Sequence, residues 1–152
     1  MTHAVLVDRA VRWLRTTRKC SIAYGEIATH APLNPDAIGW GDCCVLVEVK
    51  VSRSDYQRDR HKPSHRADAL PGSERWYLTP PGLIRPDELA DGWGLIEAHP
   101  TVIRVRVPGS RVAPTPAGLR AEIAILRSVA RRHEVGAPFD AVRGRFRPLA
   151  DR

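Results

Sequence analysis

The sequence has no long apolar run, few cysteines and almost no lysine. Nowhere in its 152 residues is there the stretch of ~20 apolar residues that a membrane-spanning helix needs, so we expect no membrane partner. No basic segment followed by an apolar one opens the chain, and no signal peptide is predicted. The three cysteines, two of them adjacent at Cys43 and Cys44, exclude a disulfide scaffold and favour a reducing, cytoplasmic location.

Three familiar kinds of site are also missing. The chain contains no glycine-rich phosphate loop and no dinucleotide fingerprint, which argues against an enzyme that uses nucleoside triphosphates or dinucleotides. His61 and His65 are four residues apart, but Pro63 lies between them and no third ligand is evident, so a zinc site is excluded. Cys43 and Cys44 have no neighbouring basic activator and are interpreted as small apolar strand residues.

The charge is strongly basic. Twenty-four lysines and arginines against 17 acids leave a net charge of +7 and an isoelectric point near 10.0. Such a balance suits a nucleic-acid partner, although solvated surface charge explains it equally well. All basic residues except Lys19, Lys50 and Lys62 are arginine, so a lysine in an unusual place needs its own explanation.

Periodicity predicts a single α/β domain over residues 1–135, a sheet sandwiched by helices, followed by a basic tail over 136–152. Glycines at 39 and 41 predict a turn over 39–42 that makes the strands on either side hairpin neighbours. The predicted helices span 4–18, from Ser52 or Ser54 to about 61, and 117–132. The predicted strands lie within 20–29, from about 36, and at 43–51, 75–79, 94–98 and 102–107.

The unusual feature is Glu48-Val49-Lys50 inside the most apolar predicted strand. Because strand side chains alternate, Glu48 and Lys50 project from one face and the flanking valines from the other. Burying a carboxylate and an ammonium there costs several kcal/mol unless partners compensate. Asp36, which follows Pro35, lies on the neighbouring strand, close enough for both carboxylates to reach one cation. A structural ion pair is the alternative interpretation.

These residues resemble the PD-(D/E)XK nuclease superfamily, in which Pro-Asp, a spacer and Glu-x-Lys lie on adjacent strands. A longer stretch, from Val47-Glu-Val-Lys50 through Ser52-Arg-Ser-Asp55-Tyr56 to Asp59 and Lys62, is similar to the MmcB-like DNA repair family. Two later segments, Trp76–Gly82 and Gly92–Glu97, are also similar, and the resemblance covers residues 20–132. It implies a restriction-endonuclease-like core, with a central mixed β-sheet flanked by helices.

The resemblance implies a Mg²⁺- or Mn²⁺-dependent DNA phosphodiesterase. Asp36, Glu48 and the carbonyl of Val49 would be oxygen ligands of the metal, and Lys50 would orient water or stabilise phosphoryl charge. Glu26 is a further candidate ligand; Asp8 on the first helix competes with it, and a solvated strand glutamate is an equal interpretation.

The helix after Lys50 carries a basic face that could bind phosphate. The alternative interpretation is a solvated amphipathic surface. Its candidate nucleic-acid-binding residues are Arg53, Arg58, Arg60 and Lys62. Two other functions stay open: a DNA-binding module that has lost catalysis, and an enzyme acting on RNA. One active site makes one cut, so cleavage of both strands requires a homodimer or two encounters.

Overall fold

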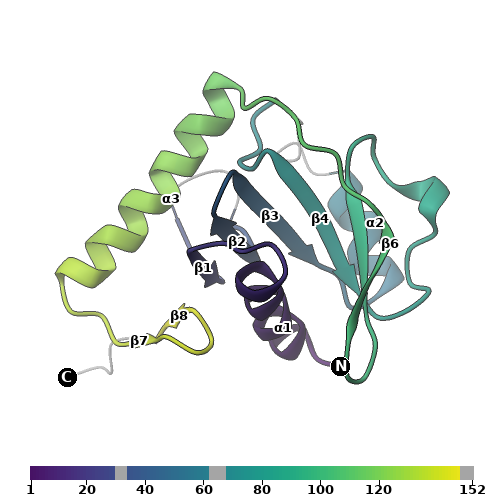
Figure 1. Cartoon of the computed structure of the whole chain (residues 1–152), viewed down its shortest axis with the longest axis horizontal. Coiled ribbons are helices and arrows are strands. Elements are labelled where there is room, and N and C mark those ends of the chain that lie inside the picture. Colours follow the sequence, from purple (N-terminus) through teal and green to yellow (C-terminus); the bar gives the residue numbers. More distant parts are fainter. Residues whose placement is uncertain (30–33, 62–67, 148–152) are drawn as a thin grey trace.

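The computed structural model describes residues 1–29, 34–61 and 68–147. Figure 1 shows helices packed around one central sheet. In chain order the larger elements are α1 (His3–Thr16), β1 (Ile22–Gly25), β2 (Ala37–Trp40), β3 (Cys44–Val49), α2 (Arg53–Arg60), β4 (Glu74–Thr79), β5 (Gly94–Ala98), β6 (Ile103–Val107) and α3 (Pro116–Glu134). The smaller ones are a 3-10 turn, η2 (Pro86–Glu88), and two short strands, β7 (Phe139–Asp140) and β8 (Arg145–Phe146).

The predicted mixed α/β sheet flanked by helices is confirmed. Six strands follow one another in space in the order β1-β2-β3-β4-β5-β6. The first three strands pair antiparallel, β3, β4 and β5 pair parallel, and β6 returns antiparallel to β5. The change from antiparallel to parallel pairing therefore falls at β3. The helix α2 forms the crossover between β3 and β4, as a parallel pair requires.

The central strand β3 is buried on both faces, as its apolar sequence predicted. All six of its residues are buried. Val45, Val47 and Val49 belong to the core beneath α1, whereas Leu46 belongs to the opposite core, which includes Tyr56 of α2. A polar side chain placed in β3 is consequently removed from water, whichever face it occupies.

Helices cover both faces of the sheet. On one side α1 buries an apolar stripe that includes Leu6, Val11 and Leu14. On the other side α3 contributes Ile125 and Val129 to the core. Within the three described ranges, no helix is long and apolar enough to cross a membrane.

The predicted turn over 39–42 is partly wrong. Gly39 and Trp40 are strand residues that pair with Val45 and Cys44, and the reversal is made by residues 41–43. Gly39 is needed for close packing, because a Cβ atom there would lie 2.9 Å from Sγ of Cys20. A glycine inside a strand thus marks a close approach here, not a turn.

The described part of the predicted basic tail, residues 136–147, forms a short hairpin of β7 and β8. Its phenylalanines pack around Tyr24 of β1: the ring centroid of Tyr24 lies 5.7 Å from that of Phe139 and 6.3 Å from that of Phe146. The hairpin therefore attaches residues distant in sequence to the first strand of the sheet.

Ser52 fixes the start of α2, the sequence having left Ser52 and Ser54 open. Its Oγ accepts a hydrogen bond from the backbone N–H of Asp55 at 3.2 Å. We expect Ser52→Ala to lower the free energy of unfolding by about 1 kcal/mol, the usual cost of a lost N-cap. Ser54→Ala, one position inside the helix, should have a much smaller effect. Urea unfolding measures both, and equal losses would contradict the assignment of the cap.

Candidate active site

β3 ends in a buried ion pair. Glu48 and Lys50 are 4% and 5% exposed, and Lys50 Nζ lies 3.5 Å from Glu48 Oε2, so the two side chains share one face as their alternation predicted. Lys50 Nζ also lies 3.1 Å from Oδ2 of Asp59, which is buried on α2. Because α2 starts directly after β3 and packs back over it, the chain that carries the ammonium also brings it a second carboxylate.

Asp36 is brought to this group by the pairing of β2 with β3. Ala37 pairs with Val47, which places Asp36 beside Glu48, a register that the sequence could not fix. Oδ2 of Asp36 accepts a hydrogen bond from the backbone N–H of Val49 at 2.8 Å. The N–H and carbonyl of one strand residue point toward the same neighbouring strand, so the Val49 carbonyl is on the Asp36 side.

Negative charge exceeds positive charge in this group. Burial, together with the charges of Asp36 and Asp59, raises the pKa of Glu48 to about 8 against the opposing charge of Lys50. Burial acts to lower the pKa of Lys50, but the carboxylates of Glu48, Asp59 and Asp36 outweigh it and raise that pKa. Oε1 of Glu48 is buried and has no hydrogen-bond partner among the described residues. It is a strong acceptor with no donor, which is costly in an apolar interior.

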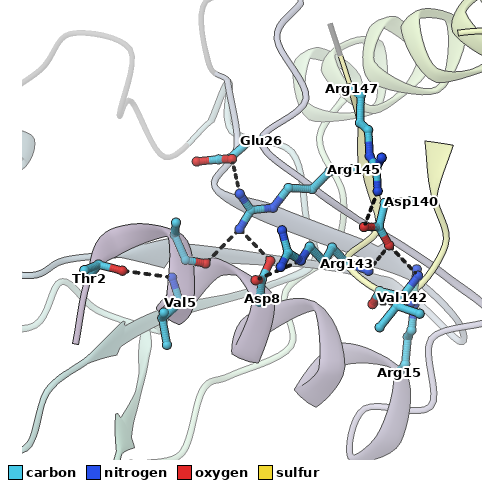
Figure 2. A network of polar contacts seen from close by, with 11 residues as sticks. Thr2, Val5, Asp8, Arg15, Glu26, Asp140, Val142, Arg143, Arg145 and Arg147 are labelled. Atoms are coloured by element: carbon cyan, nitrogen blue, oxygen red, sulfur yellow. Dashed lines mark hydrogen bonds and ion pairs between the residues drawn. The ribbon is translucent and has the colours of Figure 1, made fainter. Parts of the chain in front are cut away.

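Glu26 lies in the same cross-strand row, but its charge is already balanced. Its backbone N–H donates to the carbonyl of Asp36 at 2.9 Å. Its carboxylate is 2.6 Å from Arg145 of the hairpin, which is also 2.6 Å from Asp8 (Figure 2). His3 lies 3.6 Å from Glu26 and 3.2 Å from Asp36. A role for Glu26 as a metal ligand stays a prediction, and it would require Arg145 to share that carboxylate.

Two residues of the site had no role in the sequence prediction. The sequence carried one sign of the position of Asp59: it follows Tyr56 by three residues, so the two side chains lie on one face of the helix. In the structure these are the two buried residues of α2. His3 gave no signal, because only the fold brings the first turn of α1 beside the start of β2.

The four candidate nucleic-acid-binding residues differ in their surroundings. The guanidinium of Arg53 is engaged by both carboxylate oxygens of Glu88, each at 2.6 Å. The side chain of Arg58 is 76% exposed, and Arg60 lies 5.7 Å above the ring of Tyr56. Lys62 lies outside the described residues. Arg58 also lies 4.0 Å from Oδ1 of Asp55, a long ion-pair distance, so Arg58 and Arg60 are less tightly engaged than Arg53.

Within residues 1–29, 34–61 and 68–147, no group of three or more histidine, cysteine or acidic side chains is arranged to hold a metal ion. At the end of β3 the carboxylates of Asp36 and Glu48 are neighbours, and Lys50 lies between Glu48 and a third carboxylate, that of Asp59. Such a set can supply a few oxygen ligands, a fixed ammonium group and a buried acceptor without a donor. We regard it as the candidate active site.

Comparisons with known proteins bear on the fold. No protein-family model and no curated protein matches the chain. A solved structure, the SPO1766 protein of unknown function from Silicibacter pomeroyi, matches with a TM-score of 0.64 and 18% identity, over 89% of each chain. Likeness at this level of identity shows the fold alone, and it supports the α/β architecture with a mixed central sheet.

The raised pKa of Glu48 gives a testable pH dependence. A glutamate ionises near 4.5 when unfolded, but Glu48 holds its proton to about pH 8 when folded. The unfolded state binds fewer protons in that window, so Glu48 makes stability fall as pH rises from about 5 to 8. We expect the free energy of unfolding, measured with urea in the presence of a chelator, to decrease less between about pH 5 and 8 in Glu48→Gln than in wild type.

Glu88→Gln is the matched control. The hydrogen bond from Arg53 and that from the Arg85 backbone lower the pKa of Glu88 to about 2. Its contribution to stability is therefore lost only as pH falls from about 4.5 toward 2. Between pH 5 and 8 the free energy of unfolding of Glu88→Gln should decrease by the same amount as that of wild type. The same fall in Glu48→Gln as in wild type would contradict the assignment of a raised pKa to Glu48.

Proposed function

We propose that the protein is a divalent-metal-dependent DNA phosphodiesterase of the PD-(D/E)XK type, with Asp36, Glu48 and Lys50 as its reactive groups. One observation carries the proposal: Glu48 and Lys50 are buried together at the end of the central strand, beside Asp36, and one Glu48 oxygen has no hydrogen-bond donor in the part of the chain that the structure describes. A buried pair of ionisable groups with perturbed pKa values, with a carboxylate from the neighbouring strand beside it, is a recognised mark of a functional site.

The donor set fits a hard divalent cation. Asp36, Glu48 and the Val49 carbonyl would hold the metal through oxygen atoms, and Oε1 of Glu48 is an acceptor that lacks a donor. Mg²⁺ retains several waters and is held by one or two carboxylates in many sites, so a third protein carboxylate is not required. When bound, Mg²⁺ or Mn²⁺ supplies Lewis acidity at a phosphate oxygen and lowers the pKa of a coordinated water.

Two carboxylates position the ammonium group of Lys50 so that it can stabilise negative charge. An ammonium group has three N–H donors, and the carboxylates of Glu48 and Asp59 account for two of them. The third N–H is left for a phosphoryl oxygen or for the attacking water. A lysine fixed by two carboxylates needs little reorganisation as negative charge develops on the phosphate. Asp59 is a positioning residue in this scheme, because it acts through Lys50.

DNA is the proposed substrate because the chain carries a net charge of +7 and basic side chains follow the site directly. The exposed Arg58 and Arg60 lie on α2, whose first residue is Arg53, three positions after Lys50. Phosphate neutralisation by such residues supplies affinity without reading sequence.

The first test removes the ammonium group. We expect wild type to cut single-stranded, duplex, flapped or branched DNA with Mg²⁺ or Mn²⁺. Lys50→Met should reduce that activity by at least about a hundredfold, the typical effect of deleting one preorganised electrostatic group. Lys19→Met, the same change at an exposed lysine, should retain activity. Gel assays of each DNA form measure the rates.

Two outcomes would contradict catalysis. One is that wild type and Lys50→Met are equally inert on all four DNA forms, and the other is that they cut equally fast. In the first case the buried pair would be structural, and a DNA-binding module with the same fold would be the better description.

A second test measures the metal directly. We expect calorimetric titration with Mn²⁺ to show binding to wild type that is weakened at least about tenfold in Asp36→Asn and in Glu48→Gln, since each removes a charged ligand. In Asp36→Asn the amide oxygen of the new side chain can still accept the Val49 hydrogen bond, so this variant should keep the local backbone. The exposed Glu134→Gln is the control. Unchanged Mn²⁺ affinity in both site variants would exclude these ligands.

A further inference from the structure

A cavity of about 530 Å³ lies between the exposed side of α1 and the loop of the β7–β8 hairpin. Its charged lining consists of Arg9, Arg12, Arg15 and Arg143 and one acid, Asp8. We name this cavity the arginine groove. Figure 2 shows its hairpin side, where Arg143 of the hairpin approaches Asp8 of α1 and Arg15 of α1 reaches toward Val142. Four arginines therefore converge on one hollow, three of them at successive three-residue steps along a helix.

Most of the positive charge in the arginine groove has no carboxylate to balance it. Arg9 donates to the carbonyl of Val102 at 2.9 Å, and Arg15 donates to the carbonyl of Ala141 at 2.6 Å. Carbonyl acceptors orient a guanidinium group but leave its full charge. Arg12 is exposed, and in the part of the chain that the structure describes its side chain makes no hydrogen bond or ion pair.

The single acid of the groove already contacts an arginine outside it. Oδ1 of Asp8 lies 2.6 Å from Arg145, which is not among the residues that line the cavity. Arg143 is 3.7 Å from Oδ2 of Asp8, and its side chain is 65% exposed. Arg145 is shared between Asp8 and Glu26, so Arg143 offsets part of the charge of Asp8, and the four arginines of the groove still outnumber its one carboxylate.

The arginine groove begins close to the candidate active site. Arg145 joins Asp8, in the groove, to Glu26, in the acidic cross-strand row (Figure 2). His3, in the first turn of α1, lies 3.2 Å from Asp36. At 1.5 Å per residue along the helix, the three α1 arginines lie about 9 to 18 Å beyond His3. A DNA strand carries one phosphate per ~3.4 Å of duplex axis, so several phosphates fit along this length.

We propose that the arginine groove binds the phosphate backbone of DNA next to the phosphate that is cut. This inference rests on the proposed function for the identity of its occupant. The groove presents guanidinium groups along a helix whose first turn contacts the acidic row, and backbone carbonyls hold two of them, Arg9 and Arg15. Guanidinium forks match phosphate oxygens. The groove therefore serves as a sequence-independent clamp that sets where the strand lies, in addition to the α2 arginines.

The test uses the two arginines whose removal disturbs least. Among described residues the Arg12 side chain makes no polar contact, and that of Arg143 makes only the 3.7 Å contact with Asp8, so Arg12→Ala/Arg143→Ala should fold normally. Arg106→Ala/Arg127→Ala removes the same charge from exposed sites on β6 and α3. Fluorescence anisotropy with labelled flapped and duplex DNA, in chelator to prevent cutting, gives Kd across a range of salt concentrations.

We expect the groove variant to bind about tenfold or more weakly near 100 mM salt, with the slope of log K against log salt reduced by about 0.9 for each phosphate that the variant no longer neutralises. The control variant should change Kd less than about twofold. An equal weakening in both variants would overturn the groove as a site, since net charge alone would explain it. Unchanged affinity in the groove variant, or a wild type that binds no DNA, would also overturn it.

These results separate the groove from catalysis. Weakened binding in the groove variant supports the groove even if wild type cuts no DNA. Unchanged binding rejects the groove as a DNA-binding site. It does not affect the test of catalysis, which compares the cutting rates of Lys50→Met and wild type.

Discussion

The structure at the end of β3 depends on one electrostatic constraint, which is that a buried ammonium is surrounded by more negative charge than it can balance. Lys50 contacts Glu48 and Asp59 directly, and Asp36 adds a third carboxylate beside Glu48. Glu48, Lys50 and Asp59 are buried, whereas the side chain of Asp36 is 20% exposed, so water reaches this group of charges only at Asp36. In the metal-free protein a proton relieves part of the excess, because burial, together with the charges of Asp36 and Asp59, raises the pKa of Glu48. In the proposed function a divalent cation takes that place.

The topology explains why this constraint falls where it does. β3 is the strand at which antiparallel pairing gives way to parallel pairing, so its carboxyl end has a hairpin partner on one side and a crossover helix on the other. The hairpin partner delivers Asp36, and the crossover helix delivers Asp59. Open α/β sheets commonly bind ligands outside the carboxyl ends of their strands. The same arrangement places the basic surface of α2 immediately after the site.

The role of each arginine depends on its partner. Arg53 forms an ion pair with Glu88, and Arg145 forms ion pairs with Asp8 and Glu26. The charges of these two arginines are therefore offset by carboxylates of the protein itself. Arg9 and Arg15 are held by backbone carbonyls, so they are positioned without being neutralised. Composition alone treats these residues alike, so from the sequence Arg53 was predicted to bind phosphate and the α1 arginines had no predicted role.

Local patterns in the sequence determined the central strand, the amphipathic α1 and the shared face of Glu48 and Lys50, because burial of β3 and the alternation of its side chains act between near neighbours in the chain. The same patterns predicted Ser52 as one of two candidate caps. They did not determine the register that sets Asp36 beside Glu48, the contact of Asp59 with Lys50, or the hold of Arg145 on Glu26. Each of these joins separate segments through packing and ion pairing across the fold, and the energy of such a contact depends on where the whole chain places its two ends.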